Sequence, residues 1–141
     1  MTDHEREQRA SLRFGWTWLA LSAAFGVGLE TAHGFKWAPY LDDELARLLL
    51  TLGHAHGVGL SLVVLVYAFA GASLHRGRLP GHLLRAGALL IPLGFALSAI
   101  GHPEGDPSPL IVLTPLGAVL LLVALFWTAV RTFSPAPPMG D

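Results

Sequence analysis

LSLVVLVYAFAG, from Leu60 to Gly71, and LGAVLLLVALFW, from Leu116 to Trp127, are the two stretches that decide the fold of this chain. A helix on the surface of a soluble protein carries polar side chains on its outward face at every third or fourth residue. Neither stretch has such a face. We therefore predict that both stretches are helices that cross a lipid bilayer.

Two further apolar stretches accompany these, and charged residues separate all four. The four ranges are 14–35, 48–74, 83–101 and 110–130. Each has the roughly 20 residues that a helix needs to span about 30 Å of hydrocarbon. Only 13% of the 141 residues are charged, about half of the usual share in soluble proteins. The sequence predicts an all-α integral membrane protein, a bundle of four transmembrane helices.

The loops predict how this bundle is oriented. Short loops rich in Lys and Arg stay on the cytoplasmic side of a membrane. One side of the predicted bundle collects seven of these residues: Arg6, Arg9, Arg13, Arg76, Arg78, Arg85 and Arg131. The other side holds only Lys36 and Arg47. We therefore expect both termini in the cytoplasm, in a multi-pass protein of the bacterial inner membrane.

Three regions follow along the chain. We expect a cytoplasmic N-terminal segment over 1–13, a four-helix transmembrane domain over 14–131, and a disordered Pro-rich tail over 132–141. The stretch YLDDELARLLL, from Tyr40 to Leu50, is typical of a helix start, with Asp42 or Asp43 as the cap. The expected partners are the lipid bilayer and either further copies of the chain or a larger membrane complex.

Several function classes find no support in the composition. The net charge of −1 offers no basic surface to nucleic acid. The chain has no cysteine, which excludes disulfides and thiolate chemistry. No Ser-His-Asp arrangement, glycine-rich phosphate loop or pair of catalytic acids can be assembled from the sequence. It therefore gives no positive indication of an enzyme.

The segment LGHAHGVG, from Leu52 to Gly59, places two histidines inside an apolar run, where ionisable groups are costly. Four histidines belong to the predicted outer ends of the helices: His33, His54, His56 and His102. Glu30 lies about one helical turn inside the same end. The other three, His4, His75 and His82, are expected as solvated residues on the cytoplasmic side. We predict a polar, ligand-rich outer end and an inner half of plain hydrocarbon.

Spacing predicts where these side chains point. Glu30 and His33 share one helix face, and Glu-x-x-His is a spacing that carboxylate-bridged metal bundles use. His54 and His56 are two residues apart, so they point about 200° away from each other. One of them is expected as a ligand, while the other meets a loop or a second helix. A stripe at i, i+4, i+8 is also expected on the third helix, formed by Gly94, Ser98 and His102.

The segment LGHAHGVGLSLVVLVYAFA, residues 52–70, resembles the second transmembrane helix of heme-copper oxidase subunit I. More closely, residues 14–131 resemble small bacterial four-helix membrane proteins related to that subunit. The resemblance implies a heme b ligand at His56 or His54, with His33, His102 or a second subunit on the opposite side. GHPE, residues 101–104, is similar to the oxidase copper-site motif, but it ends a helix and lacks the following tyrosine. Dioxygen reduction is therefore not predicted.

Three functions stay open at this stage. The first is a site for heme b, or for a transition metal such as copper or zinc, that serves electron transfer, sensing or metal handling. Its candidate ligands are Glu30, His33, His54, His56 and His102. The second is a structural or accessory subunit of a membrane complex that holds no cofactor. The third is a component of ion or proton transport that uses Glu30 and the histidines.

Overall fold

The computed structural model describes residues 2–74 and 77–133, and the described residues form helices, turns and loops without a strand. The all-helical prediction is confirmed. The elements are α1 (Asp3–Gly34), α2 (Ala38–Leu41), α3 (Glu44–Val66), η1 (Tyr67–Gly71), η2 (Ala72–Leu74), α4 (Leu79–Ser98), η3 (Pro109–Val112) and α5 (Leu113–Thr132). The predicted tail over 132–141 lies outside the described residues except for Thr132 and Phe133, and His75 also lies outside them.

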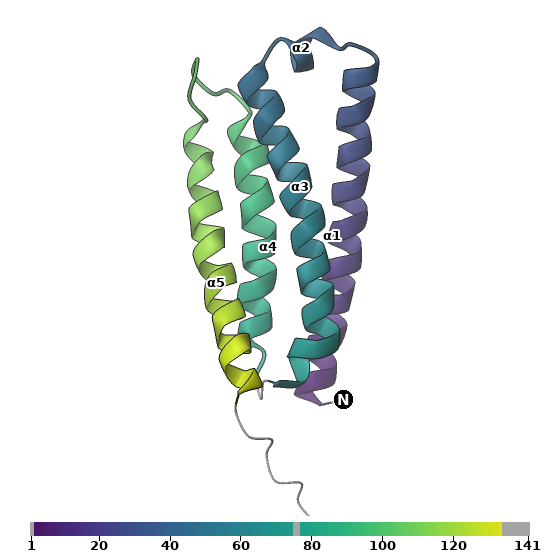
Figure 1. Cartoon of the computed structure of the whole chain (residues 1–141), viewed down its shortest axis with the longest axis vertical. Coiled ribbons are helices and arrows are strands. Elements are labelled where there is room, and N and C mark those ends of the chain that lie inside the picture. Colours follow the sequence, from purple (N-terminus) through teal and green to yellow (C-terminus); the bar gives the residue numbers. More distant parts are fainter. Residues whose placement is uncertain (1, 75–76, 134–141) are drawn as a thin grey trace, which may run out of the picture.

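The four long helices stand side by side in the order α1, α3, α4, α5 (Figure 1). Among the described residues, the extensive interfaces join α1 to α3, α3 to α4, and α4 to α5. The predicted bundle is therefore an open row, and each end helix has one main neighbour. The start of α1 and the end of α5 lie at the same end of the long axis of the molecule. At the opposite end of this axis, α2 lies between α1 and α3 (Figure 1).

Within residues 2–74 and 77–133, three stretches are long and apolar enough to cross a membrane. They are Glu44–Gly71, Leu79–Ser98 and Pro109–Thr132, with mean hydropathies of 1.8, 1.3 and 2.6. Helix α1 does not join them, because its apolar residues alternate with Thr17, Ser22, Glu30 and several glycines. By length and composition, the structure thus contains three candidate spans.

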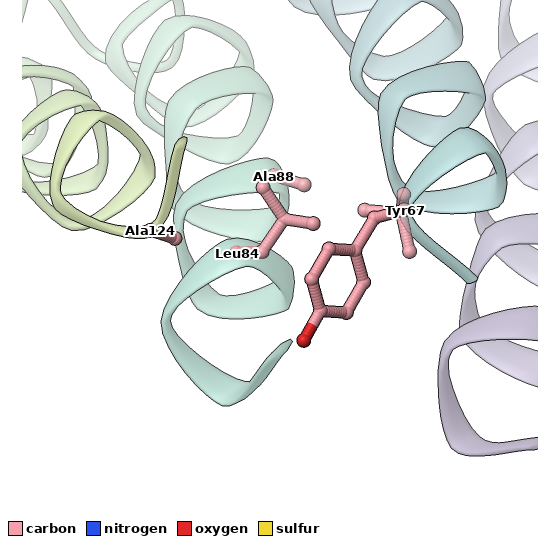
Figure 2. Packing of buried hydrophobic residues seen from close by; sticks show 5 residues of the cluster. Tyr67, Leu84, Ala88 and Ala124 are labelled. Atoms are coloured by element: carbon pink, nitrogen blue, oxygen red, sulfur yellow. The ribbon is translucent and has the colours of Figure 1, made fainter. Parts of the chain in front are cut away.

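Small residues let these helices approach closely, as in membrane helix pairs generally. A Cβ added to Gly57 of α3 would lie 2.4 Å from Oγ of Ser22 in α1, and a Cβ on Gly94 of α4 would lie 2.4 Å from Oγ1 of Thr114 in α5. A cluster of buried apolar residues lies towards the C-terminal end of α5. In it, Tyr67 reaches from η1 towards Leu84 of α4 (Figure 2).

The observed starts of α3 and α1 can be compared with the cap residues in the sequence. Asp43 caps α3, as expected, because its Oδ1 accepts a hydrogen bond from the Ala46 N–H at 2.8 Å. In the N-terminal segment, α1 already begins at Asp3 with a capping box, so residues 3–13 belong to the same helix as the residues that follow them.

Helix α4 ends at Ser98, three residues before the predicted limit of 101. The Ser98 carbonyl accepts a hydrogen bond from the Ser108 N–H at 3.0 Å, and the chain turns at Gly101 with φ of 62°. Glycine adopts this left-handed conformation without steric cost. The expected helical stripe that reaches His102 is therefore wrong, because His102 lies in the loop after α4.

Candidate functional site

His54 lies between α3 and α1. Its Nδ1 is 2.9 Å from the Ser22 carbonyl oxygen. A carbonyl can only accept, so Nδ1 is the donor, and in a neutral ring Nε2 then has the lone pair. The ring lies against Gly26, since a Cβ added there would come within 2.2 Å of the His54 Cε1. The sequence therefore supplies a glycine where the imidazole of the neighbouring helix needs room.

His56 faces the opposite neighbour. Its Nδ1 donates to the Leu52 carbonyl of its own helix at 2.8 Å, and its ring centroid is 5.0 Å from that of Phe95 in α4. The prediction that His54 and His56 point to different neighbours is confirmed. The helical period alone was enough to make it, whereas which neighbour each would meet depended on the packing order.

His102 is held by two acceptors in the outer loop. Its Nδ1 donates to the Pro103 carbonyl at 2.9 Å, and its Nε2 lies 2.8 Å from Oδ2 of Asp43. The Pro103 carbonyl, together with the bond and charge of Asp43, raises the pKa of His102 above its ordinary value of 6.5. The Ala46 N–H, together with His102, lowers the pKa of Asp43 below 3.8. The pair links the α4–η3 loop to the start of α3.

A cleft runs along the part of the α1–α3 interface that lies towards α2. Its deeper part has a volume of about 690 Å³, and its lining includes Ala23, Gly26 and Val27 from α1 and His54 and Val58 from α3. These side chains are mostly small or apolar. Along α1 the lining passes Glu30 and continues to Phe35, at the end of the helix near α2.

The mouth of the cleft is polar. It has a volume of about 750 Å³, and its lining includes Glu30 and His33 from α1 and Glu44, Arg47 and Thr51 from α3. The two parts share Glu30 in their linings, and we call them together the α1–α3 cleft. Among the candidate ligands, it brings Glu30 together with His54 at depth and with His33 at the mouth, and it leaves out His56 and His102.

The described residues contain no group of three or more His, Asp or Glu side chains arranged to hold a metal ion. The imidazoles of His54, His56 and His102 each have a protein partner of their own. Helix α3 presents its two histidines to different helices, and the turn after α4 carries the third to Asp43. Within the described residues, the predicted ligands therefore do not meet at one point.

A heme makes a smaller demand than a bare metal ion, because the porphyrin supplies four of the iron ligands and an imidazole supplies the next. His54 meets this demand in one respect, since iron-bound histidines commonly donate the other ring N–H to a carbonyl. The mouth of the cleft, in contrast, fits the carboxylates of a heme poorly. Heme carboxylates that face water would lie beside Glu30 and Glu44, with Arg47 as the balancing cation. The residues fit the iron ligand better than they fit the heme carboxylates.

A buried ionic cluster lies at the end of the molecule where α1 begins, away from α2 and the cleft. The sequence did not lead us to expect it. Glu7 of α1 is 2% exposed, and both of its carboxylate oxygens accept hydrogen bonds from Arg85 of α4. Ser11 is fully buried, donates to Glu7 at 3.0 Å and accepts from Arg85 at 2.6 Å. Arg78 adds a contact of 3.8 Å to Glu7. Charged residues were expected on this side of the bundle, but a buried cluster of them was not predicted.

Two signals in the sequence point to this cluster. Glu7, Ser11 and Gly15 are spaced by four residues, so they share a helix face, and all three are buried. Gly81 follows Pro80 at the start of α4, and a Cβ at Gly81 would lie 1.8 Å from Oε1 of Glu7. Arg85 contributed to the predicted orientation of the bundle, but its role as the partner of a buried carboxylate was not predicted.

No family model, curated protein or solved structure matches this chain.

Proposed function

We propose that this chain is an integral protein of the bacterial inner membrane with four spans and both termini in the cytoplasm. The outward faces of the row support insertion. Of the residues in α5, only Gly117 and Ala124 are buried, while large apolar side chains such as Val119 and Phe126 are 58% and 68% exposed. Exposure of this extent is costly in water and is compatible with lipid.

Helix α1 serves as the fourth span in this proposal, although it is less apolar overall. Its buried residues are Glu7, Ser11, Gly15, Ser22 and Gly26. Large apolar residues such as Trp16, Leu21 and Val27 are exposed, between 56% and 67%. A helix with its polar side chains inward and its apolar side chains outward suits lipid, because in a bilayer polar groups must find their partners inside the protein.

We propose that the function of this protein is to bind an amphiphilic ligand in the α1–α3 cleft. The observation that carries this proposal is that the two parts of the cleft adjoin at Glu30: one is lined mostly by small or apolar residues beside His54, and the other includes Glu44 and Arg47. A ligand in it would place its apolar part at the depth of Gly26 and its polar part at the outer surface. Each of the two parts of the cleft, of about 690 and 750 Å³, lies within the range of about 300–1,000 Å³ that is usual for small-molecule sites.

A pair of matched variants tests the cleft. Ala23 lines the cleft and Ala24 does not, although both are exposed residues of α1. The full chain, purified in mild detergent, should retain a bound amphiphile that native mass spectrometry detects. Ala23→Trp should lose most of it and Ala24→Trp should keep it. Equal retention by both variants, or no ligand on the wild-type chain, would contradict the proposal.

A second candidate function is heme b binding through His54, which the free Nε2 beside the cleft favours. A heme held there would supply one-electron transfer or sensing. His54→Ala should abolish the Soret band of the purified protein, and His56→Ala should retain it, because His56 packs on Phe95 outside the cleft. A colourless wild-type protein would exclude this candidate, and a band that survives His54→Ala would exclude this ligand assignment.

The two remaining hypotheses have their own discriminating observations. An accessory subunit without a ligand gains support if neither heme nor amphiphile is found, since His54 then only joins α3 to α1.

Proton transport is disfavoured by Leu65, whose side chain lies against Gly15 and interrupts the polar face of α1 between Ser11 and Ser22. Unchanged proton flux in liposomes carrying Glu30→Gln would remove the transport hypothesis.

A further inference from the structure

The mouth of the α1–α3 cleft carries charges of both signs around one groove. Glu30 lies on the α1 side, and Glu44 and Arg47 lie on the α3 side. Among the described residues, the Glu30 carboxylate has no hydrogen-bond or ion-pair partner. Glu44 has only a 4.0 Å contact with Arg47, and its side chain is 90% exposed. Two carboxylates are thus available to a cationic group.

The cation of the mouth is held in a fixed place. Arg47 donates from Nη1 to the Leu41 carbonyl at 2.7 Å, which anchors the guanidinium beneath α2. A guanidinium has five N–H donors in a planar fork, so donors remain for an anionic oxygen. The side chain of Arg47 is 33% exposed. The groove therefore offers a fixed donor for a phosphate beside acceptors for an ammonium group.

The dimensions suit a lipid. From Glu44 to Val58, the α3 wall of the cleft covers 14 residues of rise, about 21 Å at 1.5 Å per residue. The polar end would lie at the outer surface of the membrane and the apolar end towards its middle. This is the length and polarity order of a phospholipid headgroup and one acyl chain in the outer leaflet.

We propose that the mouth selects a phospholipid with a primary-amine headgroup, that is, a phosphatidylethanolamine. Its phosphate would accept from Arg47, its ammonium would donate to Glu30 or Glu44, and one acyl chain would lie beside Val27 and Val58. Counting the three charged side chains, the mouth has two negative charges and one positive charge. An anionic headgroup such as phosphatidylglycerol, which lacks the ammonium, is therefore disfavoured. This inference rests on the proposed binding function of the cleft.

Native mass spectrometry of the delipidated full-length protein tests the inference. Synthetic phosphatidylethanolamine and phosphatidylglycerol with identical acyl chains are added at equal concentration. We expect a preference for phosphatidylethanolamine of about two- to fivefold, the size that a partly exposed ion pair produces. Glu30→Gln should reduce the preference. Glu104→Gln, a change of an exposed acid in the α4–η3 loop, should leave it intact.

The outcomes separate this inference from the proposed function. If both lipids bind equally and Ala23→Trp abolishes their binding, the cleft stands and its headgroup selectivity is wrong. If Ala23→Trp leaves lipid binding unchanged, the cleft itself is not the site. A preference that survives Glu30→Gln combined with Glu44→Gln would overturn the assignment of the carboxylates. Melting temperatures of all variants, measured in the same detergent, show whether each remains folded.

Discussion

At the scale of single residues, the contact between His54 and Gly26 fixes how far apart α1 and α3 stand at the base of the cleft. A Cβ at Gly26 would overlap the imidazole, with 2.2 Å to Cε1 and 2.7 Å to Nε2. The ring is also held by the Ser22 carbonyl, so it has little freedom to give way. The position of the His54 ring therefore requires a residue without a Cβ at position 26.

Gly26→Ala should therefore destabilise the protein by about 1–3 kcal/mol, the usual cost of overpacking. Gly28→Ala provides the control, because a Cβ there meets nothing within 4 Å. The melting temperature of each variant in detergent is the measurement. An equal effect of the two substitutions would show that the His54 ring does not occupy the place described.

The second prediction at this scale concerns the pair of Asp43 and His102. The raised pKa of His102 means that its stabilising effect is full below 6.5 and is lost as the pH rises through its higher pKa in the folded protein. The lowered pKa of Asp43 means that its contribution is present above 3.8 and is lost as the pH falls through its lower folded pKa. The pair should therefore stabilise the protein most between pH 3.8 and pH 6.5, the ordinary pKa values of Asp43 and His102.

Asp43→Asn should lower the melting temperature more at pH 5.5 than at pH 8.5. His102→Gln should behave in the same way, and at pH 5.5 the double variant should lose less than the sum of the two single losses, because both substitutions remove the same pair. A difference between wild type and Asp43→Asn that does not change with pH would refute the pairing. The Asp43 carboxylate would then act only as the cap of α3.

At the scale of elements, the cluster around Glu7 joins the start of α1 to the start of α4. Both partners are nearly removed from water, with side-chain exposures of 2% for Glu7 and 11% for Arg85. The carboxylate also lies near the N-terminus of α4, where a negative charge is favourable. Removing one member of a buried ion pair leaves the other charge without its compensation.

Glu7→Gln should therefore cost about 3 kcal/mol, the lower end of the range for a broken buried pair, because Ser11 remains as a partner of Arg85. Asp3→Asn, a change of an exposed acid in the first turn of the same helix, should have little effect. Chemical or thermal unfolding in detergent gives the comparison. A loss for Glu7→Gln as small as that for Asp3→Asn would show that the cluster does not hold the helices together.

The helices themselves were largely predictable, because their signals are local. The apolar length of α5 and the Asp43 cap of α3 are written in neighbouring residues. The end of α4 was not predictable, since it depends on the bond between Ser98 and Ser108 across the loop. The Glu7 cluster was missed for the same reason, because its partner Arg85 lies 78 residues away.

The site was predictable only in part. The helical period separated His54 from His56, yet the open order of the helices decides that His54 meets α1 and lines a cleft while His56 meets Phe95. The cleft itself has no sequence signature, because it forms where the small residues Ala23 and Gly26 of α1 lie at the depth of His54 in α3.

At the scale of the whole molecule, the proposed topology makes a prediction that the absence of cysteine renders easy to test. Single cysteines are introduced by Asp3→Cys, Lys36→Cys, Gly77→Cys and Glu104→Cys. In right-side-out membrane vesicles, a membrane-impermeant maleimide should label positions 36 and 104, and it should label positions 3 and 77 only after lysis. Labelling of positions 3 and 36 from the same side would mean that α1 does not span the membrane.

The most direct measurement is an experimental density map of the wild-type protein in a lipid nanodisc, because it observes the α1–α3 cleft with its occupant in place. The account predicts elongated density that begins beside Arg47 and Glu30 and runs past His54 towards Val58. A heme would appear instead as flat density against His54. Closure of α1 onto α3 along this length, or a cleft filled by a helix of another chain, would contradict the claim that the cleft binds an amphiphile.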